Sequence, residues 1–257
     1  MKSLIKYIFR NRFALKIRNS FNIRPIPIYT ENLERCSVSD CFAWRTDKNF
    51  KTCFKYSDIL NLFFKIKNSY VEFIFFDKQN KLIKKHRVNN LDYSNELHID
   101  SEFLGGLSDY GTFYVHHYTD QEINNNDVIA NKCYIGYAID KQLHSFVHGN
   151  ILAHFQNFKA KNINENSDLV TTSIFKNQNY KIAKTFDDYD KNELFFSNPT
   201  SKILNISIDE INFFLNPNHS KIIDIGSRNV VNIKSNCLIL RPTIFSYKKN
   251  YLDVHHS

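Results

Sequence analysis

Short apolar runs separated by clusters of Asn, Asp and Ser dominate the chain from Phe54 onward. Regular spacing of such short runs favours an antiparallel β-sandwich or barrel over a helical fold. The expected strands are residues 71–76, 112–118, 133–139, 193–197, 203–208, 211–215, 221–225 and 230–234. We therefore predict a mainly β chain of the antiparallel sandwich or jelly-roll type.

Turns and helices should be built from a restricted set of residues. The 257 residues include only 6 Gly and 5 Pro, so Asn and Asp, which tolerate left-handed backbone geometry, should form most turns. Residues 57–65 read as a short helix opened by Ser57, and residues 151–158 as a second one. Residues 160–168 are polar and lack an apolar period, which predicts a linker.

The sequences on either side of this linker resemble each other. Each orders a strand, an Asp-centred turn and a second strand, then a further strand, then a hairpin that opens with Cys133 or Cys237. The hairpins end in Val147-His148 and Val254-His255. We expect a first β domain at residues 28–159 and a second at 169–257, possible products of an internal duplication, with a ligand cleft between two similar sandwiches.

Residues 1–27 differ from the rest in charge. Seven basic residues precede the first acid, Glu31, so of the net charge of +8 only about +1 (8 − 7) remains for the rest of the chain. Residues 2–18 predict an amphipathic helix with Leu4, Ile8 and Leu15 on one face, and the prolines of residues 22–27 predict an extended connector. The basic side chains expected at a membrane surface are Lys2, Lys6, Arg10, Arg12 and Lys16.

A basic, acid-free amphipathic helix suits an anionic membrane surface, because its apolar residues enter the acyl boundary while Lys and Arg meet headgroups. Three alternatives stay open: packing of the helix on the protein's own sheet, a targeting peptide, and a nucleic-acid arm. Nucleic acid is disfavoured because the body is nearly neutral. The sequence contains no apolar stretch of spanning length, which predicts a cytoplasmic protein, peripheral to a membrane at most.

The five cysteines stand at positions 36, 41, 53, 133 and 237. Their odd number and the absence of a C-x-x-C pair favour free thiols in a reducing compartment over a disulfide framework or a zinc finger. Gly-rich phosphate loops, the G-x-S-x-G elbow and H-E-x-x-H are all missing from the sequence. We accordingly expect no cofactor, and a binding protein rather than an enzyme.

Ligand-binding candidates come from aromatic, Arg and His residues. The single Trp, Trp44, is followed by Arg45, and an aromatic ring beside polar groups suits sugar recognition. The structural alternative is a core Trp beside a surface ion pair. Tyr residues recur with period two from Tyr110, so they could extend an aromatic platform on one strand face. The predicted ligand-binding set is Trp44, Arg45, Tyr110, Tyr114, His148, Arg241 and His255.

Metal binding is the alternative use of the ten histidines. His98 and Asp100 lie two residues apart, and with His219 they would form the two-histidine, one-carboxylate triad of iron oxygenases on jelly rolls. A composite site from His117, His148 and His255 is a further geometric option. The structural alternative is that most of these histidines are half-buried strand residues bonded to backbone.

The prediction for function is a non-enzymatic β-sandwich that binds a glycan or a protein partner, at the cytoplasmic membrane face if the basic segment binds lipid. A role related to surface polysaccharide is compatible with these features. The alternative is a His-centred enzyme on a jelly-roll scaffold, either metal-dependent or carbohydrate-modifying.

Overall fold

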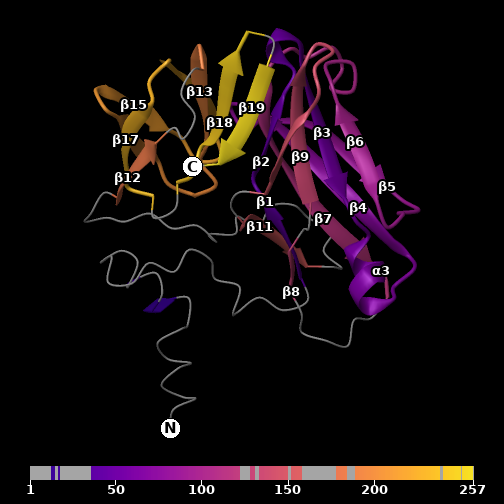
Figure 1. Ribbon diagram of the computed structural model, residues 1–257. Helices are drawn as coiled ribbons and strands as arrows, with labels where there is room; N and C mark the ends of the chain where they lie inside the picture. Colours follow the sequence, from indigo (N-terminus) through magenta and orange to yellow (C-terminus); the bar gives the residue numbers. More distant parts are fainter. Residues whose placement is uncertain are drawn as a thin grey trace.

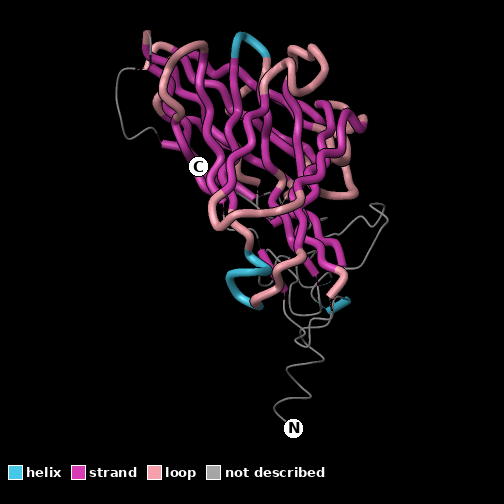
Figure 2. The backbone as a smooth tube through the Cα atoms, turned by 90° about the vertical axis from the view of Figure 1, so that its right-hand side faces the viewer, coloured by secondary structure: helices cyan, strands magenta, loops and turns pink. Residues whose placement is uncertain are grey.

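The computed structural model describes residues 36–121, 128–130, 133–149, 152–157, 178–183, 189–237, 240–249 and 251–256, together with Phe13, Ala14 and Ile17. Strands make up most of this part of the chain, in two groups that lie side by side (Figure 1). Helical segments are short and lie at the ends of the strand layers (Figure 2). The predicted mainly β, antiparallel sandwich architecture is confirmed.

The first sandwich consists of two four-stranded antiparallel sheets. Sheet I has the order β2 (Phe42–Arg45), β7 (Tyr110–Thr119), β4 (Ser69–Asp77) and β5 (Leu82–Val88). Sheet II has the order β10 (Ser145–His148), β9 (Cys133–Ile139), β3 (Phe50–Tyr56) and β6 (Asn95–Ile99).

The second sandwich also has two four-stranded antiparallel sheets. Sheet III has the order β12 (Gln178–Ala183), β17 (Val230–Ser235), β14 (Leu204–Ile208) and β15 (Ile211–Leu215). Sheet IV has the order β16 (Ser220–Gly226), β13 (Lys191–Ser197), β18 (Thr243–Lys248) and β19 (Tyr251–His256).

The smaller sheet V joins β11 (Leu152–Asn157) antiparallel and β8 (Val128–Ala130) parallel to β1 (Cys36–Asp40). Helix α3 (Ile59–Phe64) starts at Asp58, whose side chain accepts a hydrogen bond from the Asn61 amide, and Ile59 packs with Ile129 of β8. A single turn of 3-10 helix, η2 (Asp47–Asn49), connects β2 to β3.

Turn chemistry follows the prediction made from composition. Positive φ angles occur at Asn80, Asn90, Asp140, Asp209 and Asn218, each at or beside a turn or strand end. A side chain that can bond its own backbone makes this left-handed geometry accessible without glycine. The scarcity of glycine is therefore compatible with a chain made almost entirely of short strands.

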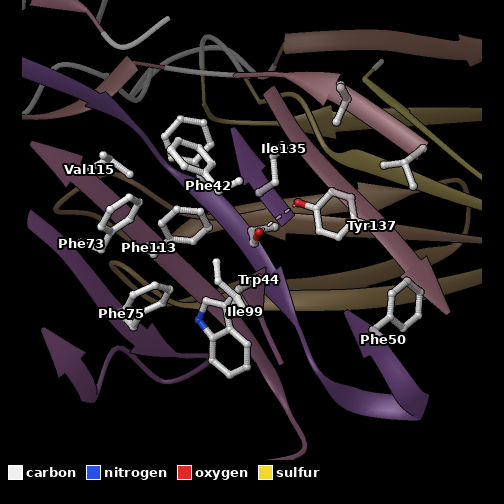
Figure 3. Close-up of a cluster of buried hydrophobic side chains, with 14 of the residues drawn as sticks. Phe42, Trp44, Phe50, Phe73, Phe75, Ile99, Phe113, Val115, Ile135 and Tyr137 are labelled. Atoms are coloured by element: carbon white, nitrogen blue, oxygen red, sulfur yellow. Dashed lines mark hydrogen bonds between the residues drawn. The ribbon is translucent and has the colours of Figure 1, made fainter. Parts of the chain in front are cut away.

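Aromatic residues fill the core of the first sandwich (Figure 3). Because alternate residues of a strand point to one face, Phe73 and Phe75 of β4 both meet Phe113 of β7, with ring centroids 6.4 and 5.1 Å apart. The Tyr137 hydroxyl donates a hydrogen bond of 2.9 Å to the Ala43 carbonyl, so this buried polar atom is satisfied. The core of the second sandwich is mainly aliphatic, with Leu194, Ile206, Val231 and Ile233 at its centre.

Sheet IV belongs to both cores. Leu194 and Ile244 point toward sheet III, whereas Phe195 and Phe245 on the opposite face join the core of the first sandwich. The Phe245 ring lies 5.7 Å from Phe50 and 4.9 Å from Tyr137 between ring centroids. The two sandwiches therefore meet through a packed aromatic interface.

Several sequence predictions can now be judged. The helix predicted at residues 57–65 is confirmed as α3, but its cap is Asp58 and not Ser57, because the Asp58 side chain accepts the hydrogen bond from the Asn61 amide. The helix predicted at residues 151–158 is wrong, because Leu152–Asn157 pairs with β1 as strand β11. Lys2, Lys6, Arg10, Arg12 and Lys16 lie outside the described residues, as do the connector and the 160–168 linker. In the part of the chain that the structure describes, no helix is long and apolar enough to cross a membrane.

Candidate functional site

Trp44 and Arg45, the first two predicted ligand-binding residues, have side chains that are completely buried. Trp44 donates its indole N–H to the Phe76 carbonyl at 2.9 Å, and both residues are 0% exposed. A ligand could not stack on Trp44 or reach Arg45 without opening the core. Trp44 is thus a core Trp, as the structural alternative predicts, whereas the burial of Arg45 depends on Glu193 of sheet IV, which lies far along the chain.

Arg45 joins the two sandwiches through buried ion pairs. Its guanidinium binds both carboxylate oxygens of Asp47, at 2.9 and 2.7 Å, and Glu193 Oε2 of β13 at 2.8 Å. It also donates to the Tyr247 hydroxyl at 3.1 Å and lies 3.9 Å from the centroid of the Phe50 ring. This network explains why Arg45 is an interface residue rather than a ligand-binding one.

Glu193 remains charged despite being buried. Burial would raise its pKa, but the positive charge of Arg45 and hydrogen bonds from Lys48 and Tyr247 lower the pKa well below its ordinary value. Lys48 and Lys191 reach Glu193 Oε1 at 2.8 and 3.0 Å. The expected cleft between the sandwiches is instead occupied, at this junction, by an ion-pair network and aromatic rings.

The remaining predicted ligand residues lie in separate places. Tyr110 is half-buried against Phe195, and Tyr114 is 8% exposed and stacks near His154, so they form no open aromatic platform. His255 lies 3.5 Å from Asp253 in the second sandwich, and Arg241 is exposed before β18. Of the predicted set, His148 alone lines the groove described next.

An open groove lies at one end of sheet II, on the face directed away from sheet I. Its volume is ≈ 610 Å³, within the range of ligand-sized cavities. The lining residues are Asp40, Lys55, Tyr56, Ser57, Ser94, Cys133, Tyr134, His148 and Gly149. We call this feature the sheet II groove.

Strand register places the main side chains of the groove in one row. Lys55 of β3 pairs with Tyr134 of β9, which pairs with His148 of β10. Tyr134 is 59% exposed, so its ring is available to a ligand. The groove thus combines one exposed aromatic ring with a cation, an imidazole and hydroxyl groups.

The opposite wall of the groove is fixed by close packing around Gly149. A Cβ atom at this position would overlap the Asp40 carboxylate, so glycine is required for Asp40 to occupy its place. The His148 Nδ1–H donates to the Gly149 carbonyl at 2.9 Å, and the His256 Nε2–H donates to the His148 carbonyl at 2.6 Å. His256 belongs to β19, so the second sandwich supports this wall.

A cluster of three potential metal-ligand residues lies beside the groove. The Cys53 thiol of β3 and His98 Nε2 of β6 both bond Glu96 Oε1, at 3.1 and 3.0 Å. Among the described residues, Cys53, Glu96 and His98 are the only three His, Cys, Asp or Glu residues whose ligand atoms all lie within 4.8 Å of one another. Lys55 connects the cluster to the groove, with its Nζ 3.4 Å from Glu96 Oε2.

Cys53 is not an activated nucleophile in this arrangement. Burial, followed by the hydrogen bond to Glu96, raises the pKa of its thiol to about 12. The thiol therefore stays protonated near neutral pH, whereas a nucleophilic Cys needs a thiolate. Thiol-based acyl transfer is accordingly a poor fit to the site.

The predicted oxygenase triad is wrong. His98 is at the cluster, but Asp100 accepts a hydrogen bond from the Phe103 amide at 2.8 Å, and His219 Nδ1 bonds the Pro217 carbonyl at 2.9 Å in the second sandwich. The composite of His117, His148 and His255 is not assembled either, since it is absent from the close groups of the described residues. His116 and His117 are strand residues, as the structural alternative predicts, but they are fully buried and not half-buried.

Neither the sheet II groove nor the Cys53 cluster is marked by a pattern in the sequence. Tyr134 and Tyr137 stand in one strand, yet Tyr134 points outward and Tyr137 inward, and only the register decides which is exposed. Cys53 meets Glu96 and His98 because β3 pairs with β6 across an intervening hairpin. No local motif marks such a pairing.

Comparisons with known proteins leave the family open. No family model matches the chain, and neither does any curated protein. Among solved structures, it is similar to a glycosyl hydrolase family 2 member from Bacteroides cellulosilyticus, at 7% identity and a TM-score of 0.20. The match covers 84% of this chain and 25% of that one, so the chain spans about a quarter of its length. A likeness this low carries no argument about function.

Proposed function

We propose that the protein binds a glycan in the sheet II groove. The observation that carries this proposal is the exposed ring of Tyr134 in a ligand-sized groove with polar walls. A sugar ring has apolar C–H faces and a rim of hydroxyls, so it pairs with an aromatic face and with hydrogen-bonding groups around it. Asp40, Lys55 and His148 supply such groups on the walls of the groove.

Binding is a better fit than glycoside hydrolysis. Most glycosidases use two carboxyl groups placed on either side of the scissile bond. Asp40 is the one acidic residue among the described residues that line the groove. The groove also favours a glycan over a protein partner, since it is concave and mixes one aromatic ring with polar groups.

Substitution of Tyr134 tests the proposal. Tyr134→Ala should weaken glycan binding by about tenfold or more, because the loss of a stacked ring costs about 1 kcal/mol beyond the area it buries. A glycan array with the full chain would identify the ligand, and isothermal titration calorimetry would compare the variants. The proposal fails if no glycan binds, or if Tyr134→Ala binds as tightly as wild type.

A matched control is available in the other sandwich. Phe214 of β15 is 74% exposed on the outward face of sheet III, far from the groove in the fold. Phe214→Ala removes an aromatic ring of similar exposure and should leave binding unchanged. Equal loss in both variants would indicate nonspecific aromatic adhesion instead of a groove site.

The basic segment supports a second part of the proposal, which is association with an anionic membrane surface. The support is the charge pattern of residues 2–18, since their basic side chains lie outside the described residues. In a liposome flotation assay with vesicles that contain an anionic lipid, the full chain should float with the vesicles. A variant lacking residues 1–26 should stay in the bottom fraction. Equal flotation of both forms would contradict membrane binding by this segment.

Internal duplication also remains a proposal, with topology as its support. Sheets I and III have matching strand orders, β2-β7-β4-β5 and β12-β17-β14-β15. Sheets II and IV match as well, β6-β3-β9-β10 and β16-β13-β18-β19. The sequence similarity of the two halves follows the same order of elements.

A further inference from the structure

Three ligand atoms of different chemistry converge on the outer face of sheet II. A thiol, an imidazole nitrogen and a carboxylate oxygen lie within 4.8 Å of one another, on β3 and β6. The thiol and the imidazole both bond the same oxygen, Glu96 Oε1. In this state two hydrogen atoms occupy the space between the three ligand atoms.

These distances are compatible with a tetrahedral zinc ion. With Zn–N and Zn–O bonds of about 2.0 Å and a Zn–S bond of about 2.3 Å, neighbouring ligand atoms lie about 3.3 to 3.5 Å apart. The sulfur and the nitrogen lie 3.1 and 3.0 Å from Glu96 Oε1, and all three ligand atoms lie within 4.8 Å of one another. Shifts of a few tenths of an ångström at the two contacts of Glu96 would therefore bring them to the separations of a zinc site.

His144 supplies a second, independent observation at the same place. Its ring centroid lies 6.5 Å from that of His98. Its Nε2 atom is buried and has no hydrogen-bond partner among the described residues. A buried nitrogen without a partner is costly unless a ligand or ion satisfies it.

The Phe146 ring of β10 covers the cluster, because the neighbouring strand has a glycine beside Cys53. Gly136 of β9 pairs with Cys53, and a Cβ at Gly136 would overlap the Phe146 ring, which lies over this gap. The Phe146 ring lies beside His144, with centroids 5.8 Å apart and the ring planes tilted by 35°, and Lys55 Nζ lies 4.8 Å from the centroid of the Phe146 ring. Cys53 is consequently 0% exposed although it points away from the core of the sandwich.

We propose that Cys53, Glu96, His98 and His144 form a zinc site on the outer face of sheet II. Zinc binding releases the thiol proton to solvent, and the His98 imidazole carries its remaining proton on Nδ1, so that Nε2 is free to bind the ion. A thiolate and a carboxylate together then balance the two positive charges of the ion. Sulfur and nitrogen ligands favour Zn²⁺ over Ca²⁺ and Mg²⁺, which prefer oxygen. The ion would join β3, β6 and the turn before β10 beside the groove, independently of any glycan.

The other cysteines of the chain differ from Cys53 in their surroundings. None of the five cysteines forms a disulfide, and among the described residues Cys53 alone belongs to a group in which a thiol, a carboxylate oxygen and an imidazole nitrogen all lie within 4.8 Å of one another. Cys133 lines the groove and belongs to no such group, so it is a nearby thiol that should bind no zinc tightly. Cys133→Ser is therefore the matched control for Cys53→Ser.

The test uses the full chain, stripped of metal by a chelator and then titrated with Zn²⁺ alone. We expect one zinc per chain after desalting, measured by plasma mass spectrometry, and a dissociation constant from competition with a chromophoric chelator. Glu96→Gln and His98→Ala should weaken binding at least 100-fold, and both change exposed side chains, so the fold should survive. Cys53→Ser should do the same, while Cys133→Ser should bind like wild type.

Cobalt gives a direct readout of the sulfur ligand. Co²⁺ in place of zinc should show the thiolate-to-metal charge-transfer band in wild type and in Cys133→Ser, and not in Cys53→Ser. Lack of stoichiometric zinc in wild type, or zinc that survives both Cys53→Ser and Glu96→Gln, would overturn the site. Unchanged affinity in His144→Ala would overturn the assignment of the fourth ligand.

Discussion

The two sandwiches share a strand order but use equivalent sheets in opposite ways. Sheets II and IV have the same arrangement of four strands, and each has one face toward its own sandwich core. On the outer face of sheet IV, Phe195 is 3% exposed and Phe245 is 0% exposed, because the first sandwich covers them. On the outer face of sheet II, Tyr134 is 59% exposed and Phe146 is 40% exposed.

The difference shows that strand topology does not determine what a sheet face does. Sheet IV provides Glu193 as the ion-pair partner of Arg45, and its outer face packs against the first sandwich beside β2 and β10. Sheet II presents the groove and the Cys53 cluster outward. One sandwich therefore supports the other, and the supported one keeps an exposed outer face, where the groove proposed to bind a glycan lies.

Breaking the interface between the sandwiches should have the largest effect. Arg45→Met leaves Glu193 buried without its main partner, and removing one member of a buried ion pair costs about 3 to 5 kcal/mol. Chemical denaturation should show this loss in the free energy of unfolding. Trp44 is the single Trp and lies in the first sandwich, so fluorescence and circular dichroism transitions should also separate in the variant.

The control for Arg45→Met is an exposed arginine. Arg228 lies 3.7 Å from Asp209 and is 49% exposed, so Arg228→Met should change stability by less than about 0.5 kcal/mol. A loss below about 1 kcal/mol in Arg45→Met would show that the interface does not depend on this ion pair.

Acid should weaken the same interface through His256, whose ring donates a hydrogen bond to the His148 carbonyl of the first sandwich. The expected loss of stability is smaller than that of Arg45→Met. Burial, the largest cause, together with the nearby positive groups Arg241, His148 and His255, lowers the pKa of His256 from 6.5 to about 4. Between these pH values the unfolded chain binds a proton that the folded chain does not, so stability falls as the pH drops from 6.5 to 4. At about 1.4 kcal/mol per tenfold change in proton affinity, the loss reaches about 3 kcal/mol at most.

The free energy of unfolding, measured by denaturation at several pH values between 4 and 6.5, should therefore change more steeply with pH for wild type than for His256→Gln. His116, whose pKa burial also lowers, should leave a remaining slope in the variant. Glu193 acts at lower pH, because a lowered carboxyl pKa gives stability that is lost as the pH falls below about 4.5. Identical slopes in wild type and His256→Gln would contradict the role of His256.

Sequence reasoning succeeded where local pattern decides the structure. The strands predicted at residues 133–139 and 211–215 coincide with β9 and β15 because each is a short apolar run between turn residues. It failed at β11, since Leu152–Asn157 fits a helix as well as a strand until β1 supplies a partner edge. The burial of Arg45 could not be predicted from local pattern, because it depends on Glu193 of sheet IV, which lies far along the chain.

The smallest expected loss of stability comes from moving the Phe146 ring that covers the Cys53 cluster. The outer face of sheet IV is covered by the first sandwich and not by such a ring. Gly136→Ala should force the Phe146 ring away from the sheet, at a cost of about 1 kcal/mol, because the new Cβ would overlap the ring. Cys53, 0% exposed in wild type, should then react faster with a thiol reagent under native conditions, as peptide mass spectrometry can measure. Phe146→Ala, which removes the cover directly, should give the same increase, whereas Cys237 should stay unreactive in both variants because it is buried in the second core. If Cys53 reacts no faster in either variant, the ring does not control access, and the two outer faces differ less than their exposures indicate.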